Sequence, residues 1–163
     1  MFLLFALVFG FGMAATVRIG QAWGANDVVS ARRALATALG LTGVISLVMA
    51  TLGIVFADKV LDLLATPGAA HDQALDYLRV VFIANPIATL TTMIAMGLRG
   101  SGDAATPLRF MILATLLDVA LNPVLILGLG PAPALGIAGS AWATVIATAI
   151  SFVAMLVRSE EHT

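Results

Sequence analysis

One carboxylate lies alone in a long uncharged stretch of the sequence. Asp118 is the only charged residue between Phe110 and Val157. A carboxylate near the middle of a membrane span costs about 2.5–3.5 kcal/mol, so such a residue faces protein or water and commonly marks an ion or proton site. A polar clamp between helices is the structural alternative. The isolated position of Asp118 favours ion or proton binding.

A second polar residue is placed to act with Asp118. Asn122 follows it by four residues, and residues at this spacing share one face of a helix. The Asn122 amide could give a carbonyl oxygen to a cation or donate a hydrogen bond to the carboxylate. Pro123 has no N–H, so we expect it to free a backbone carbonyl and to kink the helix there.

Two further polar residues are candidates for a substrate cavity. Asn85 precedes Pro86, and a kink at this proline would leave a carbonyl that either lines a cavity or is satisfied by neighbouring helices. Gln21 lies near the end of the first apolar run. Its side chain could contact substrate or cap the helix at the membrane interface.

These residues do not form a recognisable set of catalytic residues. Ser140 has no histidine or lysine within a span to activate it, and Asp118 has no partner aspartate in a second span. The chain has no cysteine, which excludes a thiolate metal site and thiol catalysis. We expect no catalytic residue, no resident metal and no cofactor.

The composition of the chain places these residues in a membrane. Of its 163 residues, 61% are apolar and 10% are charged, whereas soluble domains have about 45–50% and about 25%. A soluble fold of this size could not cover so much apolar surface. Eight basic residues against nine acidic ones give no electrostatic case for a nucleic acid partner. The lipid bilayer is therefore the expected surrounding partner.

Five apolar runs can cross the hydrocarbon core of a membrane as helices. The last two are separated by residues 128–136, where two prolines and three glycines cannot continue a helix. We predict an all-α polytopic membrane protein with spans at about residues 1–22, 34–57, 77–98, 107–127 and 136–157.

Basic residues indicate the orientation of these spans, because cytoplasmic loops carry an excess of Lys and Arg. The loops after the first and third spans and the end of the fifth contain Arg32, Arg33, Arg99, Arg109 and Arg158. The opposite side has Lys59 and Arg79. We expect a multi-pass protein of the inner (plasma) membrane, with its N-terminus outside and its C-terminus in the cytoplasm.

Both ends of the chain suggest a piece of a longer protein. An odd number of spans with an outside N-terminus and no signal sequence indicates a missing helix. Residues 158–163 form an abrupt polar hexapeptide that resembles the translated start of a sequencing adapter. We expect residues 1–157 to be native and exclude residues 158–163 from functional reasoning. A polar helix end is the alternative for this tail.

Two similar four-residue patterns follow spans on the predicted cytoplasmic side. Gly24 to Asp27 follows the first span, and Gly100 to Asp103 follows the third. We expect each glycine to end one helix and an Asp or Thr to cap the next, with Thr106 as the cap before Pro107 in the second pattern. The similarity could reflect an internal repeat or the turn chemistry of any polytopic protein.

A series of short motifs runs along residues 1–157. The motifs are Gly20-Gln-Ala-Trp-Gly-Ala-Asn-Asp27 with Ala31-Arg-Arg33, Tyr77-Leu-Arg79, Leu98-Arg-Gly-Ser-Gly-Asp103 with Thr106-Pro107, Asp118 with Leu121-Asn-Pro123, and Gly136-Ile-Ala-Gly-Ser-Ala141 with Ala143-Thr144. In order and spacing, this series resembles the multidrug and toxic compound extrusion (MATE) family.

Members of this family have twelve helices in two six-helix lobes. The resemblance implies that this chain is an incomplete N-terminal lobe, comprising helices two to six, whose polypeptide also contains a first helix and a second lobe. It also implies part of an antiporter, coupled to H⁺ or Na⁺, that exports lipophilic cationic small molecules and other drug-like xenobiotics by alternating access.

The resemblance further implies a site for the coupling cation. Family members often use an aspartate of helix one, an Asn and an Asp one turn apart on helix five, and a threonine of helix six. Here the helix-five pair is reversed, with Asp118 before Asn122, and the helix-six hydroxyl could be Ser140 or Thr144. Either residue could instead be a small packing residue beside Gly139.

A lobe of a lipid-linked sugar flippase, which shares the two-lobe architecture, is the alternative. A flippase is expected to carry more basic residues within its cavity, and the predicted spans have no Lys or Arg near their middle. The sequence therefore favours the antiporter.

Overall fold

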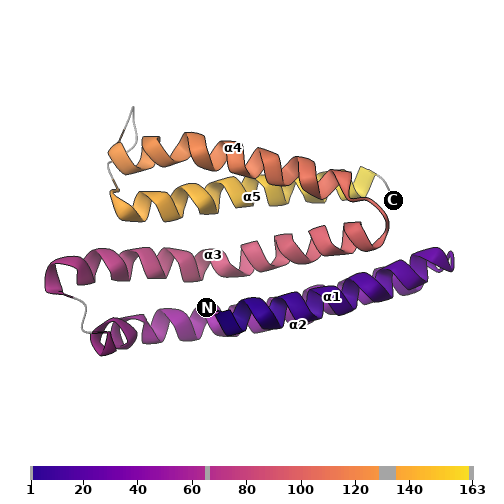
Figure 1. The fold of residues 1–163 in the computed structure, drawn as a ribbon, viewed down its shortest axis with the longest axis horizontal. Coiled ribbons are helices and arrows are strands. Elements are labelled where there is room, and N and C mark those ends of the chain that lie inside the picture. Colours follow the sequence, from indigo (N-terminus) through magenta and orange to yellow (C-terminus); the bar gives the residue numbers. More distant parts are fainter. Residues whose placement is uncertain (1, 65–66, 129–134, 162–163) are drawn as a thin grey trace.

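A computed structural model describes residues 2–64, 67–128 and 135–161, without the side chains of residues 2–8, 69 and 158–161. The described chain forms five helices, α1 (Phe2–Gly24), α2 (Val28–Leu63), α3 (Gly68–Gly100), α4 (Ala105–Leu127) and α5 (Ile137–Glu161). The helices run side by side along one long axis (Figure 1). The predicted all-α class is confirmed.

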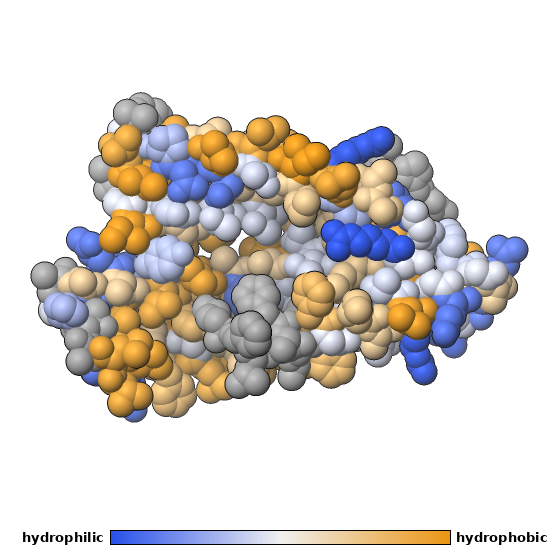
Figure 2. Space-filling view, in the orientation of Figure 1, coloured by the Kyte–Doolittle hydropathy of each residue, from blue (hydrophilic) through white to orange (hydrophobic). Residues whose placement is uncertain are grey.

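Four of the five helices contain a segment that is long and apolar enough to cross a membrane, within the described residues. These segments are residues 28–63, 70–100, 105–127 and 137–157. Hydrophobic residues cover much of the sides of the helices, and hydrophilic ones gather mainly toward the two ends (Figure 2). The first predicted span coincides with α1. Because the span includes side chains outside the described set, its membrane crossing stays a prediction.

The helices extend further than the apolar runs indicated. α2 has 36 residues and α3 has 33, so each helix extends beyond the span predicted within it, at 34–57 and 77–98, and these span boundaries stay predictions. Backbone hydrogen bonding continues a helix through polar residues wherever the local sequence permits, and only the hydrocarbon core selects for apolar side chains. α5 likewise continues to Glu161, and the non-native origin of residues 158–163 stays a prediction.

The α1–α2 and α3–α4 connections have the same backbone hydrogen bonds. The amide of Asp27 donates to the carbonyl of Ala22, and the amide of Asp103 donates to the carbonyl of Leu98, both at 2.9 Å. This six-residue bond belongs to the Schellman motif, which needs a left-handed residue just before its donor. Asn26 (φ 58°) and Gly102 (φ 92°) are those residues. Gly24 and Gly100 are the last residues of α1 and α3, as predicted. The left-handed residue of each motif comes two residues later.

An aspartate carboxylate accepts a hydrogen bond from the first turn of the next helix in both connections. Asp27 is the N-cap of α2, and Asp103 lies one residue before Ala104, the N-cap of α4. The carboxylate of Asp27 accepts a hydrogen bond from the Ser30 amide at 3.0 Å, and that of Asp103 accepts one from the Thr106 amide at 3.0 Å. The prediction that Thr106 is the cap is therefore wrong, because Asp103 reaches the free N–H groups of the first turn from a position three residues earlier.

The Ser30 hydroxyl, 2.6 Å from the Asp27 carboxylate, lowers the pKa of that carboxyl, and the backbone amide of Ser30 lowers it further. Hydrogen bonds to the charged form account for this direction. The Asp27 cap is therefore charged and formed at neutral pH.

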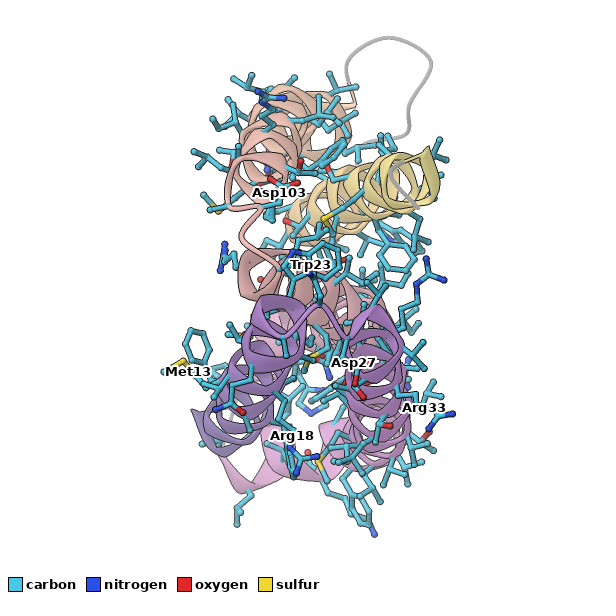
Figure 3. The ribbon with its side chains drawn as sticks, turned by 90° about the vertical axis from the view of Figure 1, so that its right-hand side faces the viewer. Met13, Arg18, Trp23, Asp27, Arg33 and Asp103 are labelled. Atoms are coloured by element: carbon cyan, nitrogen blue, oxygen red, sulfur yellow. The ribbon has the colours of Figure 1, made fainter. Side chains whose placement is uncertain are left out.

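The α1–α2 and α3–α4 connections lie at the same end of the bundle, called the turn end below and seen face on in Figure 3.

The contact between α1 and α3 depends on small residues. A methyl group added at Gly100 would lie 2.8 Å from the carbonyl oxygen of Thr16, and one added at Gly20 would lie 3.2 Å from the carbonyl oxygen of Gly100. The hydroxyl of Thr16 also donates to the carbonyl of Met96 at 3.2 Å. Close backbone approach and interhelical hydrogen bonds are the usual means of helix association in membranes.

α5 joins α4 to the rest of the bundle. It packs against both α4 and α3, whereas α3 and α4 meet only sparsely. A methyl group added at Gly139 would lie 2.5 Å from the carbonyl oxygen of Leu125, so the two backbones touch at this glycine. Ala143 and Ala147, one and two turns along α5, are 0% and 1% exposed. Gly139, Ala143 and Ala147 form a buried small-residue stripe along α5, and its first member contacts the backbone of α4.

Gly139→Ala should destabilise the protein by about 1–3 kcal/mol, because the new methyl group meets backbone atoms that cannot move aside. Gly40→Ala is the matched control, since no atom lies within 4 Å of a methyl group added there and alanine has the higher helix propensity. Thermal unfolding of the purified protein in detergent measures both. Equal melting temperatures for the two variants would contradict the close α4–α5 contact.

Candidate functional site

The structure brings Asp118 of α4 and Thr144 of α5 into direct contact. The Thr144 hydroxyl donates to one carboxylate oxygen of Asp118 at 2.9 Å, across 26 residues of sequence. Asp118 is half-buried in this arrangement. A hydrogen bond to a carboxylate is charge-assisted and stronger than one between neutral groups. The isolated carboxylate is therefore held from the neighbouring helix.

Thr144 has a second acceptor within reach. Its hydroxyl lies 3.2 Å from the backbone carbonyl oxygen of Ser140, one turn earlier in α5. A threonine hydroxyl has one proton to donate, so the Asp118 carboxylate and the Ser140 carbonyl compete for it. When a proton or cation neutralises the carboxylate, the hydroxyl can turn to Ser140 without losing its hydrogen bond.

The structure gives Asp118 and Asn122, both on α4, different roles. The side-chain amide of Asn122 donates to the backbone carbonyl of Asp118 at 3.0 Å, and not to its carboxylate. This bond ties Asn122 to the turn that carries Asp118 and leaves the Asn122 carbonyl oxygen as an acceptor. A carboxylate, an amide carbonyl and a hydroxyl are all oxygen ligands of the kind that hard cations prefer.

Thr144, rather than Ser140, supplies the hydroxyl that contacts Asp118. Ser140 takes part through its backbone carbonyl, and the two residues share one face of α5, so their spacing alone could not distinguish them. The close contact of Gly139 with the backbone of Leu125 and the hydrogen bond from Thr144 to Asp118 distinguish them. The signal that could have found this contact is the four-residue spacing of Gly139, Ala143 and Ala147.

The other predicted site residues lie apart from this pair. Gln21 is exposed near the end of α1, and α1 does not pack against α4 or α5 within the described part of the chain. Asn85 is half-buried in α3. The helices continue through Pro86 and Pro123, so neither proline ends its helix. The kinks and the substrate roles of Gln21 and Asn85 stay predictions.

One carboxylate suits a proton or a singly charged cation better than a divalent metal. Among the described residues, no group of three or more His, Cys, Asp or Glu side chains could hold a metal ion. Divalent ions such as Ca²⁺ take six to eight oxygen ligands, with several carboxylates among them. The single negative charge of a carboxylate can be balanced by one proton or by one singly charged cation.

Thr144→Val should destabilise the protein by about 0.6 kcal/mol and by no more than about 1.7 kcal/mol, which are the mean and the maximum for interhelical hydrogen bonds in a membrane protein. Thr144→Ser keeps the donor and should remain close to the unchanged protein. Ser140→Ala is the control, because the carbonyl that Thr144 uses belongs to the backbone. Thermal unfolding in detergent tests the ranking, and a cost for Ser140→Ala as large as that for Thr144→Val would overturn the assignment of the two residues.

The sequence of this chain is similar to bacterial transporters. It is 37% identical over 163 residues to a probable multidrug resistance protein, YoeA, of Bacillus subtilis, a match that covers 99% of this chain and 35% of the relative. It is 30% identical over 140 residues to the FAD transporter of Shewanella oneidensis, covering 86% of this chain and 31% of that protein. The chain thus spans about a third of the length of these relatives.

The fold is similar to that of solved transporters. An inward-facing multidrug resistance MATE family transporter of the MOP superfamily superposes with a TM-score of 0.84 at 25% sequence identity, over 94% of this chain and 34% of that structure. The family model for MatE matches residues 1–124. With this match over most of its length, the chain belongs to the MatE family.

Proposed function

We propose that this chain is part of a cation-coupled multidrug antiporter, in which H⁺ or Na⁺ binding at Asp118 drives export of a lipophilic cationic small molecule by alternating access. The observation that carries the proposal is the hydrogen bond from Thr144 to the Asp118 carboxylate. Relatives named as multidrug resistance proteins support the substrate class. A first helix and a second lobe would be supplied by the remaining length of the polypeptide.

The chemistry of the site supports exchange between two states. A charged Asp118 can hold a cation or the Thr144 hydroxyl, and a protonated Asp118 is a weaker acceptor, so the hydroxyl can turn to the Ser140 carbonyl. Each state satisfies the hydroxyl, so the change costs little in lost hydrogen bonds. A ligand shifts a conformational equilibrium only through its different affinity for the two states. Alternating access moves one lobe of a transporter against the other. If the α4–α5 contact changes during this motion, the site would bind the ion with a different affinity in each conformation.

A second candidate substrate is an anionic dinucleotide. The relative from Shewanella oneidensis is named an FAD transporter, and FAD carries a negatively charged pyrophosphate. Arg99 at the turn end could meet such a charge. The first proposal is favoured because several of the relatives carry multidrug names.

We also propose that the turn end faces the cytoplasm and that the protein is a multi-pass protein of the inner membrane. The α1–α2 and α3–α4 connections, which contain Asp27 and Asp103, lie at the same end of the bundle (Figure 1), so the basic residues that follow them in sequence would gather on one side of the membrane. An excess of Lys and Arg is typical of the cytoplasmic side.

Asp118→Asn tests the coupling role. Asparagine keeps the size and can accept from Thr144 but cannot change its charge, so the variant should express normally and bind substrate while its ion-driven efflux falls to background. Asn122→Ala should weaken the ion dependence with a milder loss. Efflux by the full-length polypeptide from vesicles with an imposed H⁺ or Na⁺ gradient measures both. A clamp role predicts the reverse ranking, and full efflux by Asp118→Asn would sink the proposal.

Single cysteines test the orientation. Ser30→Cys and Ser101→Cys, both in or beside the turns, should be protected from an impermeant thiol reagent in intact cells, whereas Ala70→Cys near the start of α3 should react. The chain has no cysteine of its own, so the background is clean. Labelling of Ser101→Cys from outside would reverse the proposed topology.

A further inference from the structure

A cavity of about 380 Å³ lies between α3, α4 and α5 on the side of Asp118 toward the turn end. It is lined by residues in the ranges 88–99, 107–114 and 148–155. Neither Asp118 nor Thr144 is among the lining residues, but Ala114 and Thr148 lie one helical turn from them. The cavity is therefore a separate space that begins one turn away from the Asp118 site.

The charge of the cavity has one sign. Arg99, near the end of α3, lines it, and the described residues that line it include no acidic side chain. This electrostatic setting disfavours a cation and favours a negatively charged group. Basic pockets between membrane helices on the cytoplasmic side are a known setting for acidic headgroups.

A buried hydroxyl also lines the cavity. Ser151 is 2% exposed, and its Oγ has no hydrogen-bond partner within the described part of the chain. Serine and threonine hydroxyls in helices commonly donate to the backbone carbonyl four residues earlier. Thr91, Thr92 and Thr144 do so here. A buried polar group without a partner costs free energy, so a ligand that bonds to Ser151 would gain from it.

The remaining walls are mostly apolar and adaptable, with three threonines (Thr91, Thr92 and Thr148) among them. Phe110, Met111 and Met155 line the cavity, with Pro107 and several alanines. Methionine fills irregular space and accommodates varied ligands. A mostly apolar cavity of roughly 300–1,000 Å³ with a few fixed polar groups is typical of a small-molecule site. The combination of one cation, one free hydroxyl and flexible apolar walls is suited to an amphipathic molecule.

We infer that this cavity binds an amphipathic organic anion. Its acidic group would lie at Arg99, its apolar part would lie against Phe110, Met111 and Met155, and the Ser151 hydroxyl would hydrogen-bond to the ligand. The same chemistry is offered by an acidic phospholipid of the surrounding leaflet and by a soluble amphipathic acid. The inference goes beyond the proposed function and does not depend on it, because ion exchange takes place at Asp118.

Two matched fluorescent probes test the inference. Anilinonaphthalene sulfonate is an amphipathic anion, and N-phenyl-1-naphthylamine has the same rings without the sulfonate. Binding of each to the protein in nanodiscs of zwitterionic lipid is measured, with empty nanodiscs subtracted. Arg99→Gln should weaken binding of the sulfonate roughly tenfold or more and leave the uncharged probe unchanged. Ser151→Ala should weaken the sulfonate less, and Arg99→Lys should retain most of its affinity.

Arg33→Gln is the matched control, because Arg33 projects away from the bundle near the same end (Figure 3) and does not line the cavity. Helix content measured by circular dichroism confirms that each variant is folded. Displacement of the sulfonate by phosphatidylglycerol in the nanodisc would identify a lipid as the ligand, and displacement by laurate alone would identify a soluble acid. Either result supports the inference.

Three results would overturn it. The first is equal loss of sulfonate binding in Arg33→Gln and Arg99→Gln. The second is binding of the sulfonate that neither phosphatidylglycerol nor laurate displaces. The third is no sulfonate binding by the folded protein together with a Ser151→Cys thiol that does not react with a small reagent, because the cavity would then be filled by protein. Efflux by Asp118→Asn does not enter these outcomes, so failure of the proposed function is recognised separately.

Discussion

The contact of two helix backbones at Gly139 determines the geometry of the candidate site. Lipid tails are as apolar as the helices that they surround, so helices associate in a membrane through close packing and interhelical hydrogen bonds. Because Gly139 has no side chain, the carbonyl of Leu125 can approach α5 at a distance that any side chain would prevent. The approach brings Thr144, farther along α5, to 2.9 Å from the carboxylate of Asp118. The same helix packs on α3 and so connects the site with the rest of the bundle.

The negative charge of Asp118 places a further constraint on the candidate site. Charge in an apolar setting requires polar partners, and Asp118 has a partner that can leave. The Thr144 hydroxyl has an alternative acceptor in the backbone carbonyl of Ser140. The side-chain amide of Asn122 donates to the backbone carbonyl of Asp118 and does not occupy the carboxylate. Toward the turn end, Arg99 gives the neighbouring cavity the opposite preference, so the two spaces are suited to ligands of opposite charge.

Much of the fold could be predicted from sequence because it follows from local patterns. Apolar runs indicated the helices, and the turn residues indicated an aspartate cap at Asp27, which the structure has. Asp118 was found because a lone charge in an apolar stretch is conspicuous. The longer ends of α2 and α3 were missed, since hydropathy measures the hydrocarbon core and not the helix. The capping role of Asp103 was missed because the backbone continues as a turn beyond it before α4 begins. The choice of Thr144 over Ser140, and the cavity beside Arg99, depend on how three helices rotate against one another, which no local pattern specifies.

Infrared difference spectroscopy measures the central claim most directly, because a protonated carboxyl group and a carboxylate absorb at different frequencies. The protein is compared at low and high H⁺ and at low and high Na⁺, beside Asp118→Asn under the same conditions. Exchange at Asp118 predicts a carboxyl band that changes with at least one of the two ions and is missing from the variant. An identical difference spectrum for Asp118→Asn, or no carboxyl change with either ion, would contradict the account.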